Sequence, residues 1–294
     1  MTSTLSHPPL TGKTISEGFS FIESGPDDVN FEAIRSIILD GDHNGAVVYV
    51  IRNSFSESTA GAIVEEFDRI LERTQGGSRT NDSYVRTQQI GSTQFAKTGR
   101  EYTLDHASRA PELLSLLDSV DEEELETVFR TGLVEKVLGS EGVTFRASRY
   151  KNLSAGFATF RRWLDNGEMS LMPHDDSAQL KYAARDGFEI ASVPHVVSYN
   201  AAIQSSANGG LLSVWNLSPD DEYRGHFDVV ETGYPYPVDV VGEIESIRLE
   251  LQVGDVYFLN SSFIHGVTSV AAGQRLTAGR FIGRISSDAA VYWT

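Results

Sequence analysis

The chain of 294 residues contains no cysteine. Disulfides, thiolate catalysis, iron–sulfur clusters and cysteine-based zinc sites are therefore excluded, and any metal must be held by histidine and carboxylate side chains. Basic residues are also scarce, because 24 lysines and arginines stand against 41 acidic residues, which gives a net charge of −17. This charge repels phosphate backbones and anionic lipids, so it disfavours a nucleic-acid or membrane partner.

Long apolar runs are missing as well. The longest, residues 46–51, is far too short to span a bilayer, and residues 1–18 contain no apolar run of signal-peptide length. We therefore expect a cytoplasmic protein that acts on a small molecule as a monomer or homodimer. Hydrophobic residues still make up 40% of the chain, which is enough for a sizeable core.

The first half of the chain predicts mostly helices, with a short β-branched strand at 46–51 between the first two. Apolar residues recur with helical spacing in four segments, at 31–38, 63–71, 113–117 and 125–133. Ser54 and Glu57 form a possible capping box for the second helix, and Pro111 suits the first turn of the third.

One stretch of this half has no clear period. Residues 76–103 are polar and dotted with glycine, and a segment of that length is typical of a lid or a surface loop. We expect residues 1–294 to form a single domain. Its parts would be a flexible start over 1–18, a helix-rich flank with this lid over 19–143, and a β core over 144–294.

From about Thr144 the hydrophobic period changes to two, which indicates strands. Short strand-like runs separated by turns lie at 156–162, 195–203, 211–217, 247–253, 256–259, 267–270 and 276–285. The pattern predicts an antiparallel sandwich or barrel with the helices packed on its outside.

One histidine has chemically significant neighbours. In an extended chain, His174 and Asp176 would leave the same face and converge, whereas Asp175 would point the other way. His265 supplies a second imidazole at the start of a later strand. Two histidines and one carboxylate leave open positions on a metal, as in non-haem Fe(II) oxygenases.

An arginine follows ten residues after His265. If a hairpin is centred near Ala272, His265 pairs with Gly279, and Arg275 and Thr277 share the face of His265. Arg275 would then lie about 13 Å along the strand from the metal. A five-carbon diacid can bridge that span, with its far carboxylate clamped by the guanidinium.

His174-x-Asp176, His265 and Arg275-x-Thr277 together resemble the signature of Fe(II)/2-oxoglutarate-dependent oxygenases. The resemblance implies an α+β fold with a mainly β core, namely a double-stranded β-helix (jelly roll) with flanking helices from the N-terminal half. It also implies Fe(II), 2-oxoglutarate and dioxygen as cofactor and cosubstrates. Iron would be held by the two histidines and Asp176, and 2-oxoglutarate by Arg275 and Thr277.

Three further segments narrow the resemblance. Residues 158–161, 209–217 and 290–293 are similar to the free-standing enzymes that hydroxylate N-succinyl amino acids or halogenate indole alkaloids and nucleotides. In the halogenases a small residue replaces the iron carboxylate, so Asp176 implies a hydroxylase. Arg161 would assist the cosubstrate carboxylate or bind substrate.

The expected substrate is a small molecule with an unactivated C–H bond, such as an amino acid derivative or a natural-product intermediate. In this family the lid and strand ends line the pocket, which makes substrate candidates of Phe95, Ala96, Gly99, Trp215 and Phe281. An anionic substrate would also need a cation, for which Arg86, Arg100 and Arg162 are candidates.

Two other functions fit part of the pattern. A cupin-type enzyme would use the metal without 2-oxoglutarate, but Arg275-x-Thr277 argues against it. A non-catalytic jelly-roll binding module would use His174 and His265 for packing or for a structural ion. The open set of metal ligands and the long lid favour an enzyme over this module.

Overall fold

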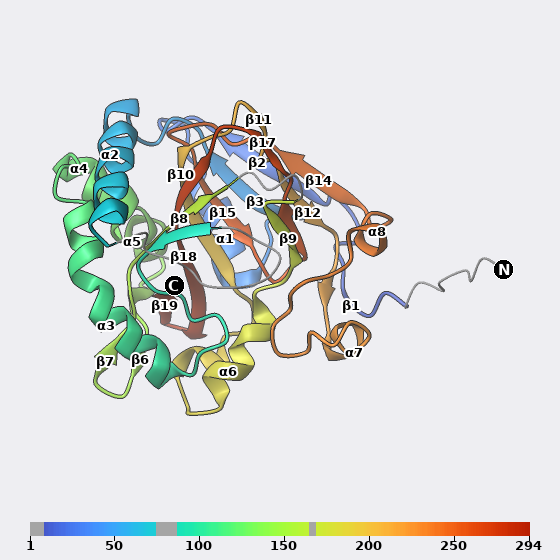
Figure 1. The fold of residues 1–294 in the computed structure, drawn as a ribbon. Helices are drawn as coiled ribbons and strands as arrows, with labels where there is room; N and C mark the ends of the chain where they lie inside the picture. The colour runs from blue at the N-terminus through green and yellow to red at the C-terminus, as the bar shows by residue number, and fades with distance from the viewer. Residues whose placement is uncertain (1–8, 75–86, 165–168) are drawn as a thin grey trace.

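Two β-sheets form the centre of the molecule in the computed structural model, which describes residues 9–74, 87–164 and 169–294 (Figure 1). Within these residues the larger sheet has nine strands and the smaller has four. A cluster of apolar side chains from both sheets, including Val48, Tyr257, Leu212 and Val267, fills part of the space between them. The sheets therefore pack face to face around a shared interior.

The larger sheet is antiparallel through its centre, whereas the outer pairs β2–β3 and β19–β5 run parallel. Its main path contains, in spatial order, β2 (Ser20–Ser24), β3 (Ala46–Ile51), β15 (Val256–Asn260), β10 (Val197–Gln204), β18 (Arg275–Ser286), β19 (Ala289–Trp293) and β5 (Thr144–Ala147). Beside the first half of β18 lies β8 (Thr159–Trp163), followed by β4 (Thr87–Ile90). Strand β3 is buried along its whole length, which explains its unbroken apolar sequence.

The smaller sheet is antiparallel throughout. Its order is β14 (Ser246–Leu249), β12 (Leu212–Trp215), β16 (His265–Val267) and β9 (Leu171–His174). Short pairs outside both sheets join β1 (Gly12–Lys13) to β13 (Ser218–Pro219), β11 (Asn208–Gly209) to β17 (Val270–Ala272), and β6 (Arg149–Tyr150) to β7 (Leu153–Ser154).

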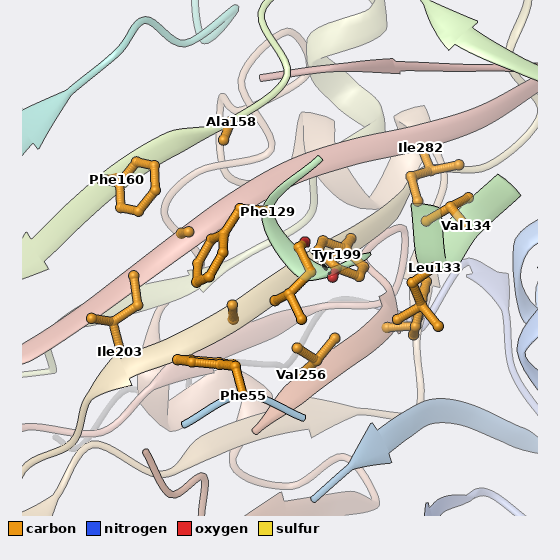
Figure 2. Close-up of a cluster of buried hydrophobic side chains, with 14 of the residues drawn as sticks. Phe55, Phe129, Leu133, Val134, Ala158, Phe160, Tyr199, Ile203, Val256 and Ile282 are labelled. Atoms are coloured by element: carbon orange, nitrogen blue, oxygen red, sulfur yellow. Dashed lines mark hydrogen bonds between the residues drawn. The ribbon is translucent and has the colours of Figure 1, made fainter. Parts of the chain in front are cut away.

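Helices from the first half of the chain cover the outer face of the larger sheet (Figure 1). They are α1 (Phe31–Asp40), α2 (Glu57–Arg73), α3 (Gly99–Leu116), α4 (Glu122–Glu124), the π-helical turn η1 (Leu125–Phe129) and α5 (Gly132–Gly139). Figure 2 shows this layer, where Phe129 and Leu133 pack against Tyr199, Val256 and Ile282 of the sheet. Each such large apolar side chain contributes about 1.5–3 kcal/mol to folding.

Among its described residues, the second half adds only short helical segments. They are η2 (Ser177–Gln179), α6 (Leu180–Ala184), η3 (Glu189–Ser192), α7 (Asp221–Gly225) and α8 (Val238–Val241). No helix among the described residues is long and apolar enough to cross a membrane. The cytoplasmic location and the monomeric or dimeric state remain predictions.

Two helix starts differ from the sequence prediction. Helix α2 is capped by Ser56, which accepts a hydrogen bond from the backbone N–H of Thr59, so Ser54 is not its cap. Helix α3 begins after Thr98, which forms a capping box with Glu101. Pro111 therefore lies inside this helix and not in its first turn.

The structure contradicts the predicted lid at residues 87–90 and 99–103, whereas residues 91–98 form a connection without strand or helix. Residues 87–90 form β4, which pairs with β8 in the larger sheet, and α3 begins at Gly99. Residues 76–86 of the predicted lid lie outside the described residues. Strands β2, β3 and β4 also show that the first half supplies part of the larger sheet, and β1 gives residues 12–13, expected to be flexible, a strand partner.

Candidate metal and cosubstrate site

The three side chains predicted to hold a metal meet at one end of the smaller sheet. His174 ends β9 and His265 begins β16, and the two lie opposite each other in this antiparallel pair. Asp176 follows where the chain turns into η2, with φ −90° and ψ −12°. A turn, and not the strand alternation we expected, therefore brings the carboxylate to the imidazoles. One ligand atom from each residue lies within 4.8 Å of the others, and all three residues are buried.

Backbone carbonyls orient both imidazole rings. Nδ1 of His174 lies 2.9 Å from the carbonyl oxygen of Met172, and Nδ1 of His265 lies 3.0 Å from that of Phe263. Because a carbonyl only accepts hydrogen bonds, Nδ1 carries the proton in each ring and Nε2 keeps its lone pair. The two Nε2 atoms lie 3.8 and 3.4 Å from the carboxylate oxygens of Asp176.

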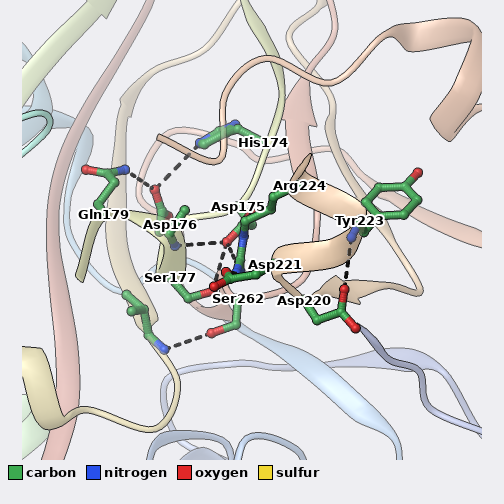
Figure 3. Close-up of polar contacts among 12 residues, drawn as sticks. His174, Asp175, Asp176, Ser177, Gln179, Asp220, Asp221, Tyr223, Arg224 and Ser262 are labelled. Atoms are coloured by element: carbon green, nitrogen blue, oxygen red, sulfur yellow. Dashed lines mark hydrogen bonds and ion pairs between the residues drawn. The ribbon is translucent and has the colours of Figure 1, made fainter. Parts of the chain in front are cut away.

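The environment of Asp176 suits a bound cation. Burial raises the pKa of its carboxyl group, and the neighbouring His265 opposes that rise. The amide of Gln179 donates a hydrogen bond of 3.2 Å to Oδ1, as Figure 3 shows. A divalent cation between these groups would stabilise the ionised carboxylate. Two imidazole lone pairs and a carboxylate are also the donors that Fe(II) takes in open oxygenase sites, so the residues fit that metal.

The predicted cosubstrate residues lie on the opposite sheet, facing the metal ligands. In the pairing of β18 with β8, Thr277 lies opposite Arg161, and Arg275 lies opposite Trp163. The guanidinium of Arg275 donates a hydrogen bond of 3.3 Å to the hydroxyl of Tyr257. Arg275 and Thr277 are both buried. A buried guanidinium with further donors available can bind a carboxylate through two hydrogen bonds.

The hairpin predicted near Ala272 does not form. His265 pairs with Val214 and His174 in the smaller sheet, whereas Gly279 pairs with Thr159 in the larger one. The reason is that the chain leaves the smaller sheet after β16, passes through β17 and enters the larger sheet at β18. Arg275 still faces the metal ligands, because the two sheets face each other.

A cavity separates the two groups of side chains. It holds about 690 Å³ of space, part of it open to solvent, and its lining combines the three metal ligands with Arg161, Trp163, Asn200, Tyr257, Arg275 and Thr277. Small-molecule sites are typically hollows with a few convergent polar groups, as in this cavity. The predicted metal ligands and the predicted cosubstrate residues therefore reach the same interior space from opposite walls.

A smaller hollow adjoins this cavity and shares His174, Asp176 and Arg161 with it. Two predicted substrate residues, Phe95 and Phe281, line this hollow. Tyr234 lines it as well, with its ring centre 5.8 Å from that of His174 and 6.3 Å from that of Phe95. Sequence reasoning missed Tyr234, because its own loop carries no motif.

The other three predicted substrate residues lie away from the cavity. Ala96 is exposed, with a left-handed backbone at φ +55°. Gly99 begins α3, and an added Cβ there would lie only 2.5 Å from Cβ of Phe188. Trp215 packs with Leu217 in an apolar cluster apart from the cavity. We do not carry these three residues forward as substrate contacts.

The predicted cations are likewise not at the cavity. Arg162 points away from it and is paired with Asp68 at 2.5 Å. Arg100 is exposed on α3, and Arg86 lies outside the described residues. In the part of the chain that the structure describes, Arg161, the neighbour of Arg162, lies beside the predicted metal ligands His174 and Asp176.

A family model described as carrier-protein-independent halogenase WelO5 matches residues 31–294. The chain belongs to this family. It is also 43% identical over 285 residues to the L-isoleucine 3(1)-dioxygenase of Pantoea ananatis (strain AJ13355), a match that covers 97% of this chain and 96% of the relative. The enzyme is thus a 2-oxoglutarate-dependent non-haem iron dioxygenase, as its motifs predict.

Solved structures agree on the fold. An N-substituted L-amino acid dioxygenase from Burkholderia ambifaria AMMD superposes with a TM-score of 0.53 at 15% identity, covering 90% of each chain. The same enzyme in complex with α-ketoglutarate gives 0.50 at 16% identity, again over 90% of each chain. At such low identity, the likeness extends to the arrangement of the sheets and helices only.

Proposed function

We propose that this enzyme hydroxylates an aliphatic C–H bond of a small amino acid or amino acid derivative. Fe(II) is bound by His174, Asp176 and His265, and 2-oxoglutarate lies between that metal and Arg275. The observation that carries the proposal is the single cavity with three converging metal donors on one wall and Arg275 with Thr277 on the other.

The protein contributes binding and orientation to this reaction. Arg275 holds the far carboxylate of the cosubstrate, and Thr277 adds a hydroxyl donor to the same group. When bound, the iron and its cosubstrate supply the oxidising chemistry, in which 2-oxoglutarate is decarboxylated to succinate and one oxygen atom enters the substrate. The residues that line the cavity are largely buried, which limits the contact of the reacting groups with bulk water.

The substrate class follows from the relatives and the hollow together. The printed names of two similar enzymes specify L-isoleucine and N-substituted L-amino acids. In this chain Phe95, Tyr234 and Phe281 give the hollow an aromatic wall beside the metal ligands, which suits an aliphatic side chain. Arg161 borders the hollow and the cavity, where it serves a carboxylate of the cosubstrate or of the substrate.

We assign hydroxylation and not chlorination, although the matching family model is described by a halogenase. Asp176 takes the coordination position that chloride would need, and its negative charge opposes a second anion there. We also propose that the two facing sheets are a double-stranded β-helix, which the likeness to the N-substituted L-amino acid dioxygenase supports.

The test is a substrate panel of free and N-acylated aliphatic L-amino acids with Fe(II), 2-oxoglutarate and air. We expect one subset to give a product 16 mass units heavier and an equivalent amount of succinate. The Asp176→Ala variant is the control and should give neither. Oxidised product without succinate would instead support a cupin-type enzyme, and absence of metal binding would support a binding module.

A further inference from the structure

A closed polar network lies directly behind the metal-binding turn. Asp175 is fully buried, and its carboxylate points to the opposite side of the turn from that of Asp176, toward Arg224 (Figure 3). The guanidinium of Arg224 donates to both carboxylate oxygens of Asp175, with distances of 2.8 and 3.1 Å. The hydroxyl of Tyr236 donates to the same carboxylate at 2.8 Å.

The carboxylate of Asp175 also organises the turn itself. It accepts hydrogen bonds from the hydroxyl of Ser177 at 2.8 Å and from the backbone N–H of Ala178 at 3.1 Å. Asp176 lies between the residues that these two bonds connect. The backbone conformation that directs Asp176 toward the imidazoles is therefore held by its neighbour.

A distant segment completes the network. Residues 221–236 contribute Arg224 and Tyr236, and the backbone N–H of Asp175 donates to the carbonyl of Gly233 at 3.0 Å. Gly233 has φ +62°, and an added Cβ would lie 2.3 Å from the carbonyl oxygen of Asp175, so only glycine allows this approach. The next residue, Tyr234, is the one whose ring contacts His174.

We propose that Asp175, held by Arg224 and Tyr236, is a positioning residue for the metal site. It fixes the turn that presents Asp176, and it sets the wall residue Tyr234 against His174. A buried ion pair is not by itself evidence of stability, but a network with every oxygen occupied defines one geometry. This inference rests on the proposed metal ligands, and it goes beyond them to residues that never touch the metal.

The mildest test removes one hydroxyl. Tyr236→Phe deletes the hydrogen bond to Asp175 and changes no charge. Tyr223→Phe is the matched control, because the hydroxyl of Tyr223 is also buried but has no hydrogen-bond partner among the described residues. Co(II) binding is measured by titration and followed by visible absorption. Tyr236→Phe should bind Co(II) at least about 10-fold more weakly than the unmodified enzyme, and Tyr223→Phe should bind it equally well. A loss of this size is usual when a residue that supports a metal ligand is removed.

The stronger test removes the charge. Asp175→Asn should weaken Co(II) binding further than Tyr236→Phe. Asp221→Asn is its control, since Asp221 also binds Arg224 at 3.0 Å but lies on the solvent side, away from the turn. With substrate present, Asp175→Asn and Tyr236→Phe should also form more succinate per hydroxylated product than their controls.

Equal Co(II) affinity and equal coupling in Tyr236→Phe and Tyr223→Phe would overturn the proposal, whatever happens to the melting temperature. If Asp175→Asn does not fold, the comparison of Tyr236→Phe with Tyr223→Phe still tests the proposal. The ligand assignment is checked separately with His265→Ala: if that variant binds Co(II) as tightly as the unmodified enzyme, the proposed metal ligands have failed and not this inference alone.

Discussion

The two sheets carry different kinds of proposed functional residue. On the smaller sheet, His174 and His265 lie at strand ends, and Asp176 lies in the turn that follows. On the larger sheet, Arg161 and Thr277 lie within strands and Arg275 begins β18, and all three are paired with a neighbouring strand.

This difference explains how each wall keeps its geometry. Side chains within a paired strand are oriented by the register of the sheet, so Thr277 and Arg161 need little extra support. His174 and His265 are likewise paired with each other. Asp176 lies in a turn that has no such register, so in our proposal its position depends on the bonds that Asp175 makes with Arg224 and Tyr236. Variants on the smaller sheet should affect metal binding, and those on the larger sheet should affect the cosubstrate.

The largest effect is expected on the smaller sheet. His265→Ala removes one of three metal donors and should abolish iron binding and turnover. The protein should stay folded, because the buried apolar clusters and not the metal dominate its stability. Metal content by elemental analysis, with circular dichroism as the folding control, tests this. An iron-loaded, active variant would remove His265 from the site.

The second-largest effect tests whether Asp176 is an iron ligand. Asp176→Gly should lose most hydroxylation through weaker iron binding, and it opens a position at which chloride can coordinate. The unmodified enzyme should give no chlorinated product at any chloride concentration. Product mass spectrometry with and without chloride checks both statements, and chlorination by the unmodified enzyme would show that Asp176 is not the iron ligand.

The third effect belongs to the larger sheet. Arg275→Leu should raise the apparent KM for 2-oxoglutarate by about 100-fold or more, since losing one partner of a buried charge pair costs about 3–5 kcal/mol. Iron affinity should stay near that of the unmodified enzyme. Arg275→Lys keeps the charge but cannot form two parallel hydrogen bonds to a carboxylate. Its KM for 2-oxoglutarate should lie between those of the unmodified enzyme and Arg275→Leu. An unchanged KM in Arg275→Leu would mean that another residue binds the far carboxylate of 2-oxoglutarate, and Arg161 would be the first candidate.

The smallest effect lies outside both walls. Burial lowers the pKa of His195 from its ordinary value of 6.5, and its Nε2 lies 3.0 Å from the carbonyl of Ile38. Below pH 6.5 the His195 side chain therefore binds a proton in the unfolded chain more readily than in the folded chain. The contribution of His195 to the free energy of unfolding is complete above pH 6.5 and falls as the pH drops below it. His195→Gln should flatten this loss between pH 7.5 and 5.5 by at most about 1.4 kcal/mol per pH unit.

Urea unfolding at the two pH values measures that slope. His226→Gln is the control for replacing a histidine by glutamine, because His226 is exposed. Parallel slopes in His195→Gln and the unmodified enzyme would mean that other groups cause the loss of stability.

Local patterns predicted much of the fold and the site. Period-two alternation located β10, β12, β15 and β18 within two residues at most ends, because each strand has its own hydrophobic signal. The spacing of His174, Asp176 and His265 gave residues that the structure brings together.

Non-local pairing was not predictable in the same way. The hairpin around Ala272 was wrong because the sequence does not show that the chain changes sheets between β16 and β18. The contacts of Asp175 were missed for a related reason. Its partners Arg224 and Tyr236 lie 49 and 61 residues away, in a segment between the predicted strands at 211–217 and 247–253.

The most direct test of the facing-wall arrangement is anaerobic titration of the enzyme with Fe(II) and then 2-oxoglutarate, followed by visible absorption. We expect a weak charge-transfer band that appears only when both are present. The band should be absent in His265→Ala, and in Arg275→Leu it should require far more 2-oxoglutarate. Iron binding without any band on addition of 2-oxoglutarate would contradict the account, because the two walls would then not hold metal and cosubstrate together.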